Sequence, residues 1–455
     1  MAEAGETSPV IESRAEMIEA LSRGCKPKAE WRIGTEHEKF TFYRDTRQPV
    51  PYGGANGIRA ILQGVMAEGG WEPNYDGDNI IGLSHMDGSS ISLEPGGQLE
   101  LSGAPLATIH QTCHETHEHL KLLRRVCDPL NIGFLGLGVA PTWKLEDIPA
   151  MPKSRYGIMK PYMEKVGSLG TSMMFRSSTV QVNLDFSSEA DMVRKLRVGL
   201  ALQPVATALF ANSPFAGGEL SGFLSFRSHI WLNTDKDRTG MLPFAFDDGM
   251  GFERYVDYAL DVPMYFVIRN GRYVDCAGES FRAFLDGKLP QLPGERPTRK
   301  DWEDHLSTLF PEVRLKQFLE MRGADGGPWQ GICALPALWT GILYDGQALD
   351  EAWDLVRHWT ADERDQLRKA VPVEALHAPF RNGTVADIAR QMVDISRGGL
   401  ARRNRTNWEG ADETVFLAPL DQTLTLGKTP AERLVDLYRG EWNGDLDWIF
   451  EESTF

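Results

Sequence analysis

The first chemically suggestive residues are two glutamates, two positions apart, in a strand-like segment at positions 31–42. Side chains alternate along a strand, so one face of this segment carries Glu36, Glu38, Phe40 and Phe42. The Cα atoms of the two glutamates are expected about 6.5–7 Å apart. Two carboxylates at this spacing cannot both stay unpaired in a buried site, but they suit a hard divalent cation. A solvated strand face is the alternative.

Three further segments repeat this pattern of one apolar and one polar face. Positions 90–102 predict two strands around a tight turn at Pro95-Gly96-Gly97, with Ile91, Leu93, Leu99 and Leu101 facing a core and Ser90, Ser92, Glu94, Gln98, Glu100 and Ser102 on the other face. Positions 179–185 predict a strand that projects Gln181 and Asn183. Positions 315–322 predict a strand that projects Phe318, Glu320 and Arg322 together.

If these strands share one sheet, five carboxylates converge on a concave surface: Glu36, Glu38, Glu94, Glu100 and Glu320. Only cations can neutralise such a surface. Oxygen ligands without histidine or cysteine favour Mg²⁺ or Mn²⁺ over zinc.

Magnesium held by carboxylates usually accompanies bound phosphates, which predicts ATP as a co-substrate. The chain has no Walker A loop, because Gly427-Lys428-Thr429 is preceded by Gln422 where the upstream glycine is required. Gly136-Leu137-Gly138 fails as a dinucleotide fingerprint, because Pro141 occupies the third glycine position. The remaining interpretation is a nucleotide held against a carboxylate-bearing antiparallel sheet.

The composition is that of a globular enzyme, with 42% apolar and 25% charged residues among 455. A formal charge of -16 and a pI near 5.2 argue against nucleic acid or an anionic membrane as partner. The longest apolar stretch, at 198–210, is too short for the roughly 20 residues of a membrane span. The segment Met1–Glu12 resembles neither a signal peptide nor a transit peptide, so a cytoplasmic location is expected.

Strand-like alternation dominates from near Ser13 to about Asp185, whereas the part beyond Trp329 is mostly helical. Helices are predicted at 11–23, 57–69, 107–130, 188–211, 348–359, 361–369, 384–397 and 430–439. The predicted fold class is α+β: a curved, mainly antiparallel sheet with the metal and nucleotide site on its concave face, followed by a helical C-terminal part. We expect a flexible tail at 1–12 and one domain at 13–455.

Several long motifs resemble the plant-type glutamate-cysteine ligase family. They are the segments 34–40 (GTEHEKF), 90–103, 179–185, 223–231 (FLSFRSHIW), 234–240 (TDKDRTG) and 320–328 (EMRGADGGP). The resemblance spans roughly 30–442 and identifies the chain as a bacterial member. It implies a carboxylate-amine ligase core similar to those of glutamine synthetase and the guanidino kinases.

The resemblance implies phosphoryl transfer from ATP to the γ-carboxylate of L-glutamate, followed by attack of the L-cysteine amine on the acyl phosphate. It assigns two or three metal ions to Glu36, Glu38, Glu94, Glu100, Gln181 and Glu320. Arg227 would hold the glutamate carboxylate through its planar fork, while Arg322, with Glu320, would act at the transferring phosphate.

Four further residues have both a functional and a structural interpretation. Lys236 and Arg238 are candidates for phosphate binding, or else charged residues of a solvated turn. Tyr156 and Tyr265 are candidates for the cysteine pocket, or else core aromatics. Glutathione is a candidate feedback inhibitor, and a monomer or a homodimer is expected.

The histidines and the cysteines each have a functional and a structural interpretation. His110, His114, His117 and His119 crowd one predicted helix, but His114-Glu-Thr-His117 is one residue short of a zincin motif, so a polar helix face is favoured.

By the resemblance, Cys113 and Cys333 match one of the two redox-active disulfides of the plant enzymes. Cys276 would face Gln291, so the second disulfide is not expected, and thiols are otherwise expected to be reduced.

Three other functions are alternatives, of which the segment around Arg227 and the resemblance disfavour the first and the complete set of acidic strand residues disfavours the second. A kinase for a small guanidino or carboxylate compound would use the same metals and nucleotide. A catalytically inactive relative would retain only the fold. A ligase for another amine would share the chemistry but not the product.

Overall fold

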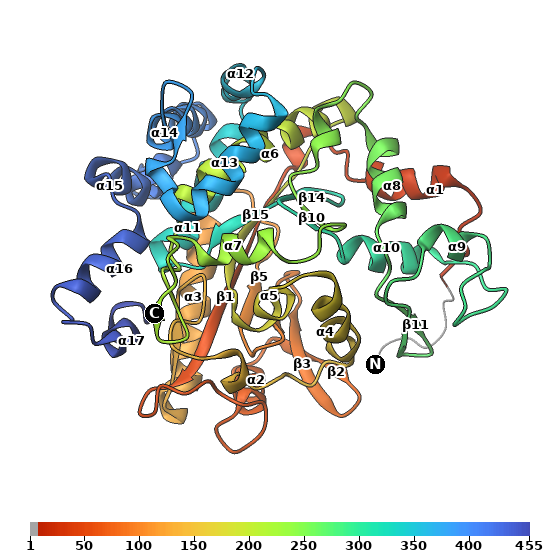
Figure 1. Cartoon of the computed structure of the whole chain (residues 1–455), viewed down its shortest axis with the longest axis horizontal. Helices are drawn as coiled ribbons and strands as arrows, with labels where there is room; N and C mark the ends of the chain where they lie inside the picture. Colours follow the sequence, from red (N-terminus) through yellow and green to blue (C-terminus); the bar gives the residue numbers. More distant parts are fainter. Residues whose placement is uncertain (1–7) are drawn as a thin grey trace.

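The computed structural model describes residues 8–455 and has an α+β fold built around one nine-stranded sheet (Figure 1). The strand order is β14-β15-β7-β1-β5-β4-β3-β2, and β6 also pairs with β1. All of these pairs are antiparallel, which confirms the predicted sheet. The strands are β1 (Ile33–Tyr43), β2 (Trp71–Asp76), β3 (Asn79–His85), β4 (Ser90–Leu93), β5 (Leu99–Ser102), β6 (Ile132–Leu135), β7 (Thr179–Leu184), β14 (Val313–Leu315) and β15 (Leu319–Asp325).

Strand β1 has two different faces because its side chains alternate. Glu36 and Glu38 are half-buried on the concave face, whereas His37 and Lys39 on the opposite face are fully buried. The helices α3 (Ile109–Cys127), α6 (Glu189–Leu209) and α11 (Trp329–Leu343) pack against the convex face. The concave face meets α4 (Ser154–Val166), α5 (Gly170–Arg176) and α7 (Phe226–Leu232), which leaves the pocket described below.

Local sequence signals explain where several helices begin. Thr108 and Gln111 form a reciprocal capping box at α3, and the Ser188 hydroxyl accepts from the Asp191 N–H at the start of α6. The predicted helices are all present; the bounds of α16 are as predicted and the others have shifted ends. They are α1 (Arg14–Ser22), α2 (Ile58–Ala67), α3, α6, α12 (Gly346–Val356), α13 (Ala361–Glu374), α14 (Val385–Arg403) and α16 (Pro430–Arg439).

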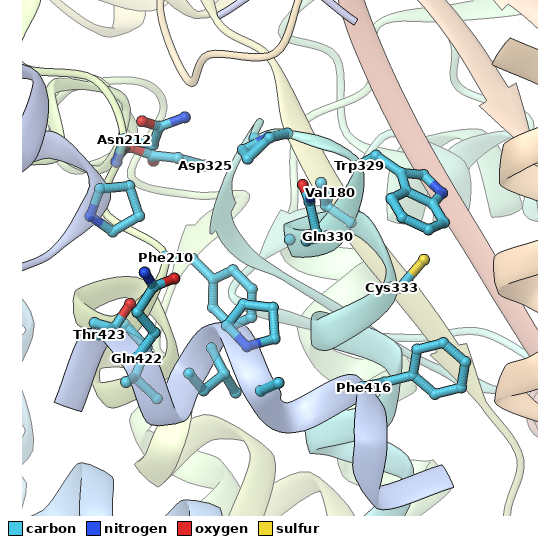
Figure 2. Close-up of a pocket in the computed structure, with 18 of the residues that line it drawn as sticks. Val180, Phe210, Asn212, Asp325, Trp329, Gln330, Cys333, Phe416, Gln422 and Thr423 are labelled. Carbon is cyan, nitrogen blue, oxygen red and sulfur yellow. Dashed lines mark hydrogen bonds between the residues drawn. The ribbon is translucent and has the colours of Figure 1, made fainter. Parts of the chain in front are cut away.

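The C-terminal part is helical, as expected, and includes α15 (Ala418–Leu426) and α17 (Ile449–Glu452). Helices α15 and α11 border a cavity of about 570 Å³ (Figure 2). Across residues 8–455, no helix is long and apolar enough to cross a bilayer.

Two sequence-based expectations need correction. The segment 315–322 is not one strand: bends at 316–318 divide it into β14 and β15, so Phe318 lies in the turn rather than beside Glu320. The predicted tail 1–12 is wrong for 8–12, because Ile11 is buried and its N–H donates to the Pro297 carbonyl. Residues 1–7 lie outside the described part, and a single domain at 13–455 stays a prediction.

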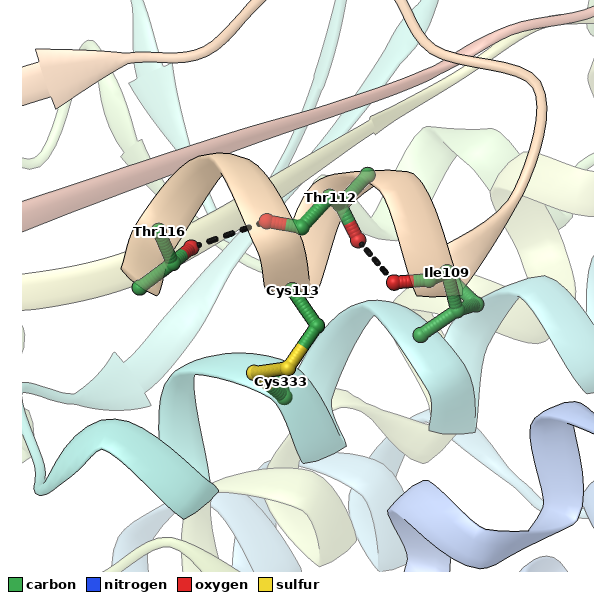
Figure 3. The surroundings of a disulfide bond; sticks show 5 residues. All are labelled: Ile109, Thr112, Cys113, Thr116 and Cys333. Atoms are coloured by element: carbon green, nitrogen blue, oxygen red, sulfur yellow. Dashed lines mark hydrogen bonds between the residues drawn. A yellow bond between two sulfur atoms is a disulfide. The ribbon is translucent and has the colours of Figure 1, made fainter. Parts of the chain in front are cut away.

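A disulfide joins α3 to α11 through Cys113 and Cys333, whose Cα atoms are 5.4 Å apart (Figure 3). This is the pair that the family resemblance indicated. The expectation of reduced thiols fits the other three cysteines, since Cys25, Cys127 and Cys276 are free in the described chain.

Reduction of this disulfide is expected to lower thermal stability. The bond closes a loop with a sequence separation of 220 residues, and the chain-entropy model gives an upper value of about 5 kcal/mol for a loop of this size. We expect a lower Tm in dithiothreitol, measured by calorimetry. Cys113→Ser should remove the dependence on reductant, whereas Cys276→Ser should retain it; equal Tm values with and without reductant would contradict this expectation.

Candidate active site

Strand register brings the predicted acidic residues together on the concave face. Glu38 of β1 lies directly opposite Glu100 of β5, and Glu36 lies opposite Gln181 of β7. Glu94 follows β4, which pairs with β5. Four carboxylates and an amide from separate chain segments therefore share one surface.

These side chains line a pocket of about 270 Å³. The strands provide its acidic floor, and α4, α5 and α7 provide the opposite wall. Its lining includes Glu36, Glu38, Glu94, Glu100, Arg155, Tyr156, Gln181, Arg227, Trp231, Arg314 and Arg322. Arg155 and Arg227 face the acidic floor from α4 and α7, whereas Arg314 and Arg322 project from β14 and β15 of the sheet itself. These four arginines are called the basic wall below.

Three of these carboxylates, Glu36, Glu38 and Glu100, have raised pKa values. Burial, with the Glu320 and Glu100 charges, raises the pKa of Glu36 to about 7. Burial, with the Glu94 and Glu100 charges, raises the pKa of Glu38 well above its usual range. The pKa of Glu100 is also raised, first by burial and then by Glu94. A cation bound among them would favour their ionised forms.

The chemistry of these donors fits magnesium. All are hard oxygen ligands. Glu36 accepts one hydrogen bond from Asn183 (2.7 Å), Glu38 one from the Thr179 N–H (3.2 Å) and Glu100 one from Ser92 (2.8 Å). Each of these carboxylates therefore has lone pairs left for a cation. No three His, Cys, Asp or Glu side chains of residues 8–455 form a compact metal-binding group. Magnesium commonly takes only one or two carboxylates, with substrate phosphates and water completing its shell, so the spread set remains suitable.

Arg227 is presented to the pocket from α7. Its guanidinium donates to the Arg322 carbonyl at 3.0 Å, while its Nε has no partner among the described residues. The main chain is fixed by the Ser213 hydroxyl, which accepts from the Arg227 N–H at 3.1 Å. Burial lowers the pKa of Arg227, with the opposing charges of Asp325 and Glu38 nearby. A buried guanidinium with an unused donor suits a carboxylate ligand.

Arg322 of β15 contacts two other residues of the sheet. Its Nη1 donates to Gln181 at 2.7 Å and to Glu320 at 3.0 Å. Gln181 is therefore engaged by an arginine, although its side chain lines the pocket.

Glu320 is placed differently from the other predicted metal ligands. The β14–β15 hairpin sets it opposite Arg314, which donates from Nη2 at 2.9 Å, and the Glu320 side chain is fully buried. The charges of Arg314, Lys316 and Arg322 outweigh burial and hold the Glu320 pKa well below its usual range. The structure thus places Glu320 beneath the pocket in an ion-pair network instead of in its lining.

The two predicted tyrosines have different positions. Tyr156 lines the pocket, and its hydroxyl donates to the Leu93 carbonyl at 2.8 Å. Tyr265 is absent from the pocket lining; it is buried, with the Arg238 guanidinium 3.9 Å from its ring centroid. The structure therefore brings only Tyr156 to the site.

Neither predicted phosphate-binding residue of the segment 234–240 reaches this pocket. Lys236 is exposed. Arg238 is fully buried, where it donates to Asp235 at 2.6 Å and to the Pro263 carbonyl at 2.8 Å. The turn looks solvated in the sequence because its burial depends on segments distant in the chain.

Arg238→Gln is consequently expected to destabilise the fold while leaving the KM for ATP unchanged. It leaves the buried Asp235 carboxylate without its cation, which typically costs about 3–5 kcal/mol. Thermal unfolding and ATP titration of the variant would measure the two effects. Lys236→Gln is the exposed control and should change neither; a raised KM for ATP at unchanged Tm in Arg238→Gln would instead indicate a nucleotide contact.

Sequence reasoning missed Arg155, Arg314 and Lys153. Arg155 precedes Tyr156 on α4 and lines the pocket, with no partner for its Nε among the described residues. Arg314 also lines the pocket, and the buried Lys153 ammonium donates to the Leu93 carbonyl at 2.5 Å. The excess of acidic residues in the floor was the available signal, since it calls for cationic groups on the facing wall.

Similar proteins are known. The chloroplastic glutamate–cysteine ligase B of Oryza sativa subsp. japonica is 56% identical and aligns with 98% of this chain and 90% of its own length. The chloroplastic glutamate–cysteine ligase of Arabidopsis thaliana is 57% identical, with coverages of 97% and 83%. The crystal structure of the Francisella tularensis glutamate–cysteine ligase with AMP has a TM-score of 0.57 at 13% identity, covering 93% of this chain and 87% of that one, so it shares the fold.

These relatives contradict one expectation from the sequence. The N-terminal segment favoured a cytoplasmic location, whereas the similar proteins of rice and Arabidopsis thaliana are chloroplastic. The composition of the first twelve residues was an inadequate guide to location.

A family model for glutamate-cysteine ligase family 2 matches residues 32–452. This range includes every side chain assigned to the acidic floor and to the basic wall. The match agrees with the resemblance found in the motifs and with the identity to curated relatives over nearly the whole chain. The chain belongs to glutamate-cysteine ligase family 2.

Proposed function

We propose that the protein joins the γ-carboxylate of L-glutamate to the amine of L-cysteine at the expense of ATP, the first step of glutathione biosynthesis. The observation that carries this proposal is the pocket in which four carboxylates and four arginines line one space, in a chain of this family. In the first step, a phosphoryl group is transferred from ATP to the substrate carboxylate, ADP leaves, and γ-glutamyl phosphate is formed. The cysteine nitrogen then forms the amide bond and inorganic phosphate leaves.

The basic wall supplies the contacts for anionic substrates. Arg227 binds a glutamate carboxylate through its free Nε and the remainder of its fork. Arg322 stabilises negative charge on the transferring phosphoryl group, and Arg155 offers a further cationic contact. These groups are fixed before substrate arrives, so little reorganisation is required during the reaction.

The acidic floor is proposed to hold two or three Mg²⁺ ions. Glu36, Glu38, Glu94 and Glu100 are the proposed ligands, with Gln181 beside them. The ions, or Mn²⁺ in their place, neutralise phosphate charge when bound. Glu320 positions Arg322 from beneath, since it forms an ion pair with that residue at 3.0 Å.

Tyr156 is proposed to border the cysteine site, because its ring lines the pocket and its hydroxyl is fixed on β4. Glutathione remains a proposed feedback inhibitor. A monomer or a homodimer remains the proposed assembly.

The deciding experiment combines purified protein with Mg²⁺, ATP and L-glutamate, with and without L-cysteine. ADP release is followed, and the product is identified by mass spectrometry. Cysteine-dependent ADP release with γ-glutamylcysteine supports the proposal. A phosphorylated product without an amine would indicate a kinase, and ADP release with another amine would change the substrate.

Metal removal is expected to abolish this activity. EDTA at an excess over Mg²⁺ should stop ADP release, and added Mg²⁺ or Mn²⁺ should restore it, because the phosphates and the acidic floor repel each other without a cation. A zinc-specific chelator is the control and should have no effect. Full activity in EDTA would contradict the assignment of the acidic floor.

A further inference from the structure

The cavity between α11 and α15 is separate from the catalytic pocket. Val180 of β7 lines this cavity, whereas its neighbours Thr179 and Gln181 line the catalytic pocket. Adjacent side chains of a strand point to opposite faces of the sheet. The two spaces therefore lie on opposite sides of β7.

The cavity walls are largely apolar. Figure 2 shows Phe210 on one side and Trp329 and Phe416 on the other, with Thr423 of α15 near Phe210. A volume of about 570 Å³ lies within the range of roughly 300–1,000 Å³ that is typical of small-molecule sites. Leaving such a surface exposed to water is unfavourable, and an apolar ligand would cover it.

The available charge in the lining is positive. Arg433 of α16 is exposed at the cavity, and its guanidinium has no hydrogen-bond or ion-pair partner among residues 8–455. The carboxylate of Asp325 also lines the cavity, but it already accepts from the Asn212 N–H at 2.9 Å and from the hydroxyls of Ser213 at 2.6 Å and Ser225 at 2.7 Å. A ligand therefore finds an unused cation but a carboxylate whose hydrogen bonds are already made.

Two glycines of the cavity lining have open space where a side chain would lie. A Cβ added at Gly327 or at Gly331 would meet no atom nearer than 3.8 Å. A larger side chain at position 331 would thus occupy cavity space without striking the backbone. Gly331 lies in the first turn of α11, where leucine favours helix more than glycine does.

We propose that this cavity is a second ligand site, which takes a small organic anion with an apolar ring system. The rings pack among Phe210, Phe416 and Leu420, and the anionic group faces Arg433. This site is independent of the proposed catalytic function, and its occupancy is measured by binding rather than by turnover.

The test uses 8-anilinonaphthalene-1-sulfonate as the probe, with ATP, Mg²⁺ and L-glutamate at saturating concentrations throughout. Fluorescence titration of the native chain should show binding, and Gly331→Leu should weaken it by at least about tenfold, equivalent to 1.4 kcal/mol. Gly346→Leu is the matched control, since Gly346 also lies in the first turn of a helix and has open space around it. Its titration should match that of the native chain.

Gln422→Trp blocks the cavity from the α15 side and provides an independent variant, because Gln422 is exposed. Circular dichroism and Tm verify folding of each variant. Unchanged probe binding in a folded blocking variant, or no probe binding when the substrates are saturating, overturns the site.

The ligand class is tested with Arg433→Gln. This variant should weaken binding of the sulfonate probe about tenfold or more, which corresponds to the loss of one charge-assisted contact. Binding of the uncharged N-phenyl-1-naphthylamine should be unchanged. Equal effects on the two probes, or none on the sulfonate, would overturn the assignment of an anion.

Discussion

Replacing Arg227 with lysine is expected to lower kcat/KM for L-glutamate by about 100- to 1,000-fold. The guanidinium is buried with its Nε free, and it faces the pocket from a helix whose main chain is fixed. Lysine keeps the charge but lacks the planar fork that binds a carboxylate through two parallel hydrogen bonds. Losing this geometry costs about 3–4 kcal/mol if each charge-assisted bond contributes 1.5–3 kcal/mol.

The matched control is Arg269→Lys. Arg269 makes a comparable fork to Asp301, with distances of 2.8 and 3.0 Å, but it is absent from the pocket lining. Its replacement should lower Tm and leave the KM for glutamate unchanged, whereas Arg227→Lys should show the opposite pattern. Steady-state kinetics and calorimetry on both variants separate the two roles. If the two substitutions reduce activity equally, Arg227 has no special part in binding glutamate.

Glu36→Gln is expected to remove activity while stabilising the metal-free protein at alkaline pH. Burial and the neighbouring glutamates raise the pKa of Glu36 from 4.5 to about 7. The folded chain therefore holds this proton more tightly than the unfolded chain does. The contribution of Glu36 to stability is fully present below pH 4.5 and is lost as the pH rises to about 7. Glutamine has the same shape and does not ionise, so it avoids this loss.

Thermal unfolding in EDTA checks the prediction at two pH values. At pH 8 the Tm of Glu36→Gln should exceed that of the native chain by about 2 °C, and at pH 4.5 the two should be similar. Activity with Mg²⁺ should fall by about 100-fold or more, because even residues supporting metal ligands contribute 10- to 100-fold. Glu72→Gln, on the exposed part of β2, is the control and should change neither quantity. An active Glu36→Gln variant would remove Glu36 from the proposed ligands.

The acidic floor could be predicted because strand alternation is a local rule. Glu36 and Glu38 share a face whatever the rest of the chain does, and the turn at 95–97 returns Glu100 to the same side as Glu94. The sequence could not determine which strands are neighbours. The direct pairing of Glu38 with Glu100 depends on a register that only the assembled sheet defines.

The basic wall was harder to predict, because tertiary packing places its side chains. Arg155 lies on a helix that packs over the sheet, and nothing in its immediate sequence distinguishes it from a surface arginine. The surroundings of Glu320 were hard to predict for a different reason. A turn at 316–318 interrupts the apparent strand and pairs Glu320 with Arg314, which removes it from the pocket lining.

The position of Arg238 also depends on tertiary packing, but here the sequence suggested exposure and the structure shows burial. Its segment, TDKDRTG, has the composition of a solvated turn, yet the folded chain buries its guanidinium against Tyr265. Burial of this kind arises from segments remote in sequence, which a local pattern does not contain.

Along the sequence, the cysteines of the disulfide separate the acidic residues of the catalytic pocket from the basic ones. Every carboxylate of the pocket lining precedes Cys113, whereas every arginine of that lining lies between Cys113 and Cys333. A single peptide-bond cleavage between the cysteines would leave an oxidised molecule in one covalent piece, with its acidic segment still tethered to both parts of the severed basic segment. After reduction, the same cleavage would release two polypeptides that only noncovalent contacts hold together.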